Sequence, residues 1–178
     1  MKSTQNFLSY EGIVNLKLID EKAKRVKKSL TLHNKGTNNL FYFLCGCLTH
    51  NSNLNSYSPA AIDVGGTEYN DTESAAWESS LAYRVLLSNK SLVQNVKSNY
   101  GDKEVTFPYV ARFSVIIPYS AFLGVSPEIK CIQLHSSAAS TDKICSLLAY
   151  LNLTEDTIVL NEGNALLIEW NMGFLNPD

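Results

Sequence analysis

The last stretch of the chain, residues 157–174, constrains the fold most. Glu162-Gly163-Asn164 is a turn signal, because glycine and asparagine tolerate positive φ angles. After this turn, apolar side chains occupy every second position, at Leu166, Ile168, Trp170, Met172 and Phe174. A period of two over this length is typical of a half-buried strand. The sequence therefore predicts a C-terminal hairpin whose second strand pairs with earlier strands of the chain.

Strand-like patterns recur along the rest of the chain. They cover residues 12–19, 26–33, 60–65, 81–87, 91–96, 104–119, 128–136 and 144–153. In the longest of them one face is expected to carry Val105, Phe107, Tyr109, Ala111, Phe113, Val115 and Ile117. Pro108 lacks an amide donor, so it is expected to mark a sheet edge or a bulge.

One segment reads as a helix. Thr37 is a plausible N-cap, and residues 38–48 are then apolar nearly all round, which is typical of a short buried helix. Many short strands with one helix predict a mainly β fold, an antiparallel β-sandwich or a jelly-roll-like domain with one short buried helix. We expect one domain over residues 12–178, preceded by an N-terminal arm, residues 1–11, that becomes ordered on a partner.

Composition and charge narrow the function classes. The chain has 178 residues, enough for a sizeable core in one domain. A formal net charge of -2 gives no overall electrostatic case for binding nucleic acid or an acidic membrane surface. No apolar run approaches the length of a membrane span, and the first residues lead into no apolar signal-peptide core. We therefore expect folding in a cytosol, with neither nucleic acid nor membrane as a partner.

The residues that most often carry chemistry form no local motif. The four cysteines are Cys45, Cys47, Cys131 and Cys145, and we expect them to be buried free thiols. The cysteines and histidines do not have the spacing of zinc ligands. The three histidines (His33, His50 and His135) accompany no nucleophile. Glu169 follows the strand pattern next to Trp170, but neighbours on a strand point to opposite faces. We expect no cofactor, no metal and no catalytic residue.

Two charged segments are candidate contact surfaces. A basic patch lies at the turn between the first two predicted strands, at Lys22, Lys24, Arg25, Lys27 and Lys28. An acidic loop, residues 66–80, contains Glu68, Asp71 and Glu73 together with Trp77. A solvated hairpin tip is the simpler interpretation of the basic patch, and no aromatic residue is interleaved with it for stacking on single-stranded nucleic acid. Because the two segments carry opposite charge, we hypothesise that they meet across a subunit boundary.

Four stretches taken together resemble a known class of proteins. Residues 30–38 (LTLHNKGTN) followed by the apolar run 40–48, residues 60–65 (AAIDVG), residues 113–120 (FSVIIPYS), and residues 147–151 (LLAYL) with 166–174 (LLIEWNMGF) are similar to segments of small structural proteins of tailed bacteriophages. Within that class the resemblance is to virion proteins of crAss-like phages. This chain carries Tyr150 where the family pattern often has arginine. The resemblance implies a β-sandwich subunit that repeats symmetrically in a particle, and it supplies no catalytic residues.

The leading hypothesis is a non-enzymatic structural subunit of a tailed-phage virion, assembled in the host cytoplasm. We expect it in the tail, collar or ring, as a homo-oligomer in contact with other virion proteins. The alternatives are a protein of the head exterior (capsid decoration or fibre) and a carbohydrate-binding adhesion module. The second alternative needs exposed aromatic side chains, for which Tyr57, Tyr69, Trp77 and Tyr100 are the candidates. A third hypothesis, a hydrolase, lacks any residue that selects a substrate.

Overall fold

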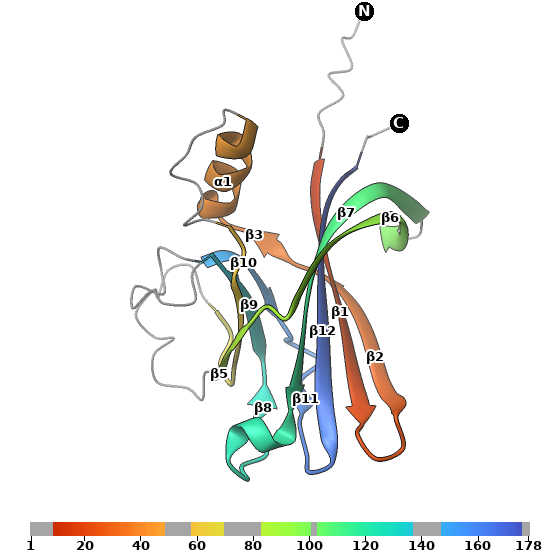
Figure 1. The fold of residues 1–178 in the computed structure, drawn as a ribbon, viewed down its shortest axis with the longest axis vertical. Helices are drawn as coiled ribbons and strands as arrows, with labels where there is room; N and C mark the ends of the chain where they lie inside the picture. The colour runs from red at the N-terminus through yellow and green to blue at the C-terminus, as the bar shows by residue number, and fades with distance from the viewer. Residues whose placement is uncertain (1–8, 49–57, 70–82, 101–102, 137–146, 176–178) are drawn as a thin grey trace, which may run out of the picture.

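The structure is a computed structural model that describes residues 9–48, 58–69, 83–100, 103–136 and 147–175. Its strands form two five-stranded antiparallel sheets, with a small two-stranded sheet at one end (Figure 1). The chain is therefore mainly β and forms an antiparallel β-sandwich, as predicted. The jelly-roll connectivity is not established by this strand order.

The first sheet is built around the C-terminal strand. Its strands, in spatial order, are β2 (Arg25–His33), β1 (Ser9–Asp20), β12 (Asn164–Leu175), β7 (Lys103–Pro118) and β6 (Asn89–Tyr100). β12 pairs with β1 from Asn164 to Leu175 and with β7 on its other side. This confirms the prediction that earlier strands pair with the last one. The strand expected from residue 12 begins at Ser9, inside the segment assigned to the N-terminal arm.

The second sheet contains shorter strands. In spatial order they are β3 (Lys35–Gly36), β10 (Leu147–Asn152), β9 (Cys131–His135), β4 (Ala61–Gly65) and β5 (Tyr83–Leu86). The single strand expected over residues 128–136 is divided, because β8 (Glu128–Ile129) pairs with β11 (Ile158–Val159) in the small sheet. A short 3-10 helix, η3 (Tyr119–Phe122), follows β7.

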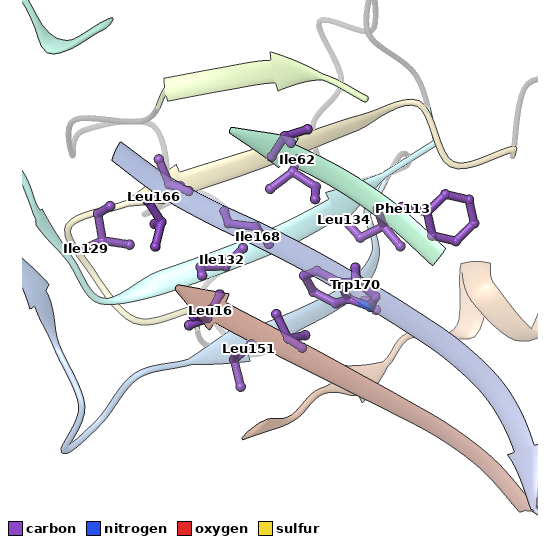
Figure 2. Close-up of a cluster of buried hydrophobic side chains, with 14 of the residues drawn as sticks. Leu16, Ile62, Phe113, Ile129, Ile132, Leu134, Leu151, Leu166, Ile168 and Trp170 are labelled. Carbon is purple, nitrogen blue, oxygen red and sulfur yellow. The ribbon is translucent and has the colours of Figure 1, made fainter. Parts of the chain in front are cut away.

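The core lies between the two large sheets (Figure 2). β12 contributes Leu166, Ile168 and Trp170, all of which are fully buried. Their partners across the core come mainly from β4, β9 and β10 and include Ile62, Ile132, Leu134 and Leu151. The face predicted from the alternation of residues 166–172 is thus the face that packs against the second sheet. Each such side chain contributes about 1.5–3 kcal/mol by leaving water.

The predicted face of β7 is interrupted in the middle of the strand. Pairing between β6 and β7 keeps one register, but Asn95 and Pro108 are left unpaired. Proline has no amide hydrogen to donate, and Asn95 takes a left-handed conformation with φ of 53°. Beyond this point the alternation changes face. The prediction that alternate residues from Val105 to Ile117 share one face is therefore wrong, because Phe107 lies in a different cluster from Phe113, and Val110 is buried while Tyr109 is exposed.

This change of face creates a second, smaller core. Phe107 and Val110 pack with Ile13 on the side of the first sheet that faces away from the main core. Gly173 of β12 lies under them, and a Cβ added there would stand 2.9 Å from Phe107 Cδ1 and 3.0 Å from Val110 Cγ1. The absence of a side chain at this position therefore allows the two strands to pack.

The one predicted helix is present as α1 (Asn38–Leu48), but the prediction that it is buried is wrong. Leu40 and Gly46 are buried, whereas Phe41 and Tyr42 are 47% and 53% exposed. Cys45 and Cys47 are exposed too, which corrects the expectation of buried thiols, whereas Cys131 is buried as expected. Cys145 lies outside the described residues. α1 packs against β10, while the side chains of Phe41 and Tyr42 remain about half exposed.

Candidate interaction surface

The most unusual surface of the molecule belongs to α1. The helix contains no charged residue from Asn38 to Leu48. Helices that are apolar all round are normally covered on every side, because leaving aromatic side chains in water is unfavourable. Phe41, Tyr42 and Cys45 nevertheless lie on the exposed side of α1, and we call this set the α1 surface.

Hydrogen bonds fix the start of α1 on the second sheet. The Thr37 amide donates to the carbonyl oxygen of Leu148 at 2.9 Å, and the Thr37 hydroxyl donates to the carbonyl oxygen of Leu147 at 2.7 Å. The carbonyl oxygen of Thr37 in turn accepts a hydrogen bond from the Leu40 amide, in the first turn of α1. The α1 surface is thus held in a defined position by β10, whereas the sequence suggested only an N-cap role for Thr37.

A second group of exposed apolar side chains lies on the first sheet. At the end of the molecule where α1 lies, this sheet extends beyond the second sheet (Figure 1). Leu92, Tyr109 and Phe174 are 71%, 56% and 44% exposed. Leu92 pairs with Ala111, which pairs with Met172, so this row continues the core-facing side of the sheet. The exposed apolar surface of the molecule is thus not confined to α1.

The basic patch is partly neutralised within the chain. Lys27 Nζ lies 3.2 Å from Asp20 Oδ2, and Lys28 Nζ lies 3.7 Å from Asp156 Oδ1. A hydrogen bond from the Ala23 amide lowers the pKa of the Asp20 carboxyl, and a hydrogen bond from Lys27 lowers it further. The described residues place no carboxylate in an ion pair with Lys22, Lys24 or Arg25. The cations that remain for a partner are therefore these three exposed residues, which we call the basic tip.

The acidic loop is described only in part. Glu68 is exposed and forms no ion pair with the basic tip within the described residues. The other three residues proposed for this contact lie outside the described residues, namely Asp71, Glu73 and Trp77. Charge pairing between the loop and the tip across a subunit boundary thus stays a prediction.

A buried polar network on the second sheet had no counterpart in the sequence analysis. Arg84 on β5 donates two hydrogen bonds to Asp63 on β4, from Nε to Oδ1 and from Nη2 to Oδ2, both at 2.8 Å. His135 Nε2 lies 2.9 Å from Gln133 Oε1 and 3.5 Å from Asp63 Oδ2. The signal for this network in the sequence is the aspartate inside the apolar segment 60–65, because a buried carboxylate requires a partner. The network ties β4, β5 and β9 together.

This network does not place a catalytic nucleophile next to a general base. Burial raises the pKa of the nearby Cys131 thiol to about 12, so the reactive thiolate is scarce at neutral pH. Cys131 and His135 lie on one strand four positions apart, roughly 13 Å at the usual rise per residue. Proton transfer requires hydrogen-bond distance. The geometry therefore favours a structural role for these residues.

Glu169 and Trp170 lie on opposite faces of β12, as predicted. Trp170 is fully buried in the core. Glu169 Oε2 accepts a hydrogen bond from Lys17 Nζ at 3.0 Å, and Glu169 Oε1 lies 3.7 Å from Arg112 Nη1. Two cations beside this carboxylate make it a cross-strand pairing group.

A hollow of about 320 Å³ lies between the ends of β2 and β6. His33 Nε2 donates to the carbonyl oxygen of Asn99 at 3.1 Å, so the two edge strands of the first sheet approach one another here. The Ser98 hydroxyl lines this hollow and is buried without a hydrogen-bond partner. His33 thereby links the two edges of the coiled sheet.

The described residues contain no group of three potential metal ligands. In the part of the chain that the structure describes, no helix has both the length and the apolar character to cross a membrane. Comparison with protein families, with curated proteins and with solved structures found no match to this chain.

Proposed function

We propose that this chain is a non-enzymatic structural subunit of a tailed-phage virion, in the tail, collar or ring, that works through symmetric contacts with other virion proteins. The observation that carries the proposal is the α1 surface. It is an uncharged aromatic surface on a helix that is anchored firmly to the sandwich.

The physical case rests on what would cover this surface. Phe41 and Tyr42 still expose about half of their surface, and protein interfaces are enriched in aromatic residues. Leu92, Tyr109 and Phe174 add exposed apolar area on the first sheet. A second protein surface that packs here would remove this area from water.

The arrangement of the contact candidates suits a repeating assembly. The basic tip lies at the end of the β1–β2 hairpin, at the opposite end of the sandwich from α1 (Figure 1). A ring built from head-to-tail contacts requires two different surfaces on every copy. The α1 surface and the basic tip lie apart and differ in character, so each can meet a different complementary surface of a neighbouring protein. The type of particle is supported by the resemblance of residues 30–175 to virion proteins of crAss-like phages.

Light scattering of the purified chain over a range of concentrations tests the role of the α1 surface. We expect oligomers, or co-assembly with other virion proteins, that are lost when Phe41 and Tyr42 are both replaced by serine. Leu123→Ser is the matched control, because Leu123 is 94% exposed and lies outside α1. A double variant that assembles as well as the control contradicts the role of α1.

Thiol labelling gives an independent readout of the same contact. Cys45 is exposed on the α1 surface of the single chain, so a maleimide reagent is expected to label it in the monomer. Burial in an assembly should protect it. Equal labelling of Cys45 in the monomer and in the assembled protein would show that α1 stays uncovered.

A further inference from the structure

A second hollow, of about 440 Å³, opens beside the start of α1. Its volume lies in the range of sites for small molecules. The described residues that line it come from the β3–α1 connection, from the segment after β4 and from β10, and they are Gly36, Thr37, Asn38, Asn39, Tyr69, Leu147 and Tyr150. The hollow is separate from the exposed side of α1 that the proposed assembly would cover.

Two tyrosines form the aromatic wall of this hollow. The ring centroids of Tyr69 and Tyr150 are 4.8 Å apart, with an angle of 56° between the ring planes. Tyr150 is buried, whereas Tyr69 is partly exposed. The buried ring of Tyr150 therefore supports the partly exposed ring of Tyr69 that lines the hollow.

Asn152 holds Tyr69 in place. Its Oδ1 accepts the Tyr69 amide at 2.9 Å, and its Nδ2 donates to the Tyr69 carbonyl oxygen at 2.9 Å. The side-chain amide thus pairs with the backbone of Tyr69 as a neighbouring strand would. A ligand does not have to order Tyr69 when it binds, which lowers the entropic cost of binding.

The lining residues at the start of α1 are fixed as well. Thr37 is bonded to Leu147 and Leu148 of β10, as described above, and Asn39 Nδ2 donates to the carbonyl oxygen of Leu147 at 3.3 Å. Asn38 is exposed at the mouth of the hollow. The side chains of Thr37 and Asn39 are thus held in position before any ligand enters.

We propose that this hollow binds a neutral saccharide. The described residues that line it include no ionisable acid or base other than the two tyrosines. Among these described residues an anion such as phosphate would find no cationic side chain, and a charged group half removed from water without a partner is unfavourable. A sugar has apolar C–H faces that pack on aromatic rings and hydroxyl groups that pair with asparagine amides. This combination matches the tyrosine wall and the asparagine wall.

The test is saturation-transfer difference NMR on the full chain with glucose, galactose, mannose and N-acetylglucosamine. Glucuronate and sialic acid serve as charged comparators. We expect saturation to reach at least one neutral sugar and neither acidic sugar. Because free protein is used, the result is independent of whether the chain assembles into a particle.

Variants then assign the binding to this hollow. Tyr69→Ala is expected to weaken binding of the neutral sugar by about tenfold, since it removes the aromatic contact. Tyr109→Ala is the matched control, because Tyr109 is also exposed but does not line the hollow. It should leave the affinity unchanged.

A second variant guards against loss of folding in Tyr69→Ala. Asn38→Asp keeps the size of the side chain, and a carboxylate is favourable at a helix N-terminus, so α1 should persist. Loss of the amide donors is expected to weaken binding about threefold or more. The proposal is overturned if no neutral sugar receives saturation, if the acidic sugars bind as well, or if Asn38→Asp and a folded Tyr69→Ala both bind like the native chain.

Discussion

Asp63 and Arg84 join two strands of the second sheet through two contacts of 2.8 Å, and the aspartate side chain is only 2% exposed. A carboxylate that is buried this deeply depends on its cation. Arg84→Met should therefore lower the free energy of unfolding by about 3 kcal/mol, because Asp63 would keep its burial and lose its counter-charge. Urea denaturation at neutral pH measures this change.

The exposed pair of Lys97 and Glu104 provides the control. These side chains are 66% and 59% exposed, although their atoms approach to 2.7 Å. Lys97→Met should change the free energy of unfolding far less than Arg84→Met does, because solvent screens an exposed pair. If both methionine variants lose the same stability, burial does not determine the contribution of the Asp63–Arg84 pair.

Gly173→Ala tests the second core. The added methyl group would lie 2.9 Å from Phe107 Cδ1 and 3.3 Å from the Tyr109 carbonyl oxygen, so strands β7 and β12 would have to shift. Overpacking of this kind costs about 1–3 kcal/mol. The midpoint of guanidinium denaturation reports the loss.

Gly66→Ala is the matched control for Gly173→Ala. Its nearest contact would be the Glu128 carbonyl oxygen at 3.4 Å, an ordinary van der Waals distance. The double variant Gly173→Ala with Phe107→Leu should recover part of the loss, since it removes atoms from the site of the clash. A Gly173 variant as stable as the Gly66 variant would contradict the close packing.

The raised pKa of Cys131 predicts a dependence of stability on pH. The thiol titrates near 9 in the unfolded chain but at about 12 in the fold, where burial disfavours the thiolate. The folded state then holds a proton that the unfolded state has released, so stability falls as pH rises from 9 toward 12. Urea titrations should show this fall to be steeper in the native chain than in Cys131→Ala. Parallel pH profiles for the two proteins would show that Cys131 does not contribute.

The basic tip allows the proposed subunit contact to be tested by charge reversal. Lys24 and Arg25 are exposed and form no ion pair within the described residues, so replacing both by glutamate should leave the fold intact. If the tip meets an acidic surface in the assembly, the double variant should assemble more weakly, and the defect should be largest at low salt. Light scattering across a salt series measures it. Intact assembly at every salt concentration would show that the charge pairing is unimportant.

The sequence predicts the sheets well where one face of a strand is buried along its whole length. The alternation from Leu166 to Met172 identifies β12 and its core-facing side, because burial imposes a period of two. The sequence predicts a sheet edge or a bulge at Pro108, but it does not predict the change of face there or the part that Asn95 plays. The change of face depends on a positive φ angle opposite a proline across the hairpin, and neither residue specifies the other locally.

The candidate site was harder to predict than the fold. The apolar composition of residues 38–48 correctly predicts a helix, but the exposure of Phe41 and Tyr42 depends on which neighbours cover the helix. The pairing of Tyr69 with Tyr150 requires two segments about eighty residues apart to meet, and only tertiary structure brings them together. Tyr69 was recognised as a candidate for stacking on sugars, but Tyr150 was noted only as a departure from a family pattern.

Quantitative mass spectrometry of purified particles tests the central proposal most directly, with the copy number of this chain referred to the major capsid protein. We predict a reproducible count that is a multiple of five, six or twelve, as the symmetry of a ring or tail requires. A count in the hundreds would place the chain on the head exterior instead. Absence of the chain from purified particles would contradict a structural role in the virion.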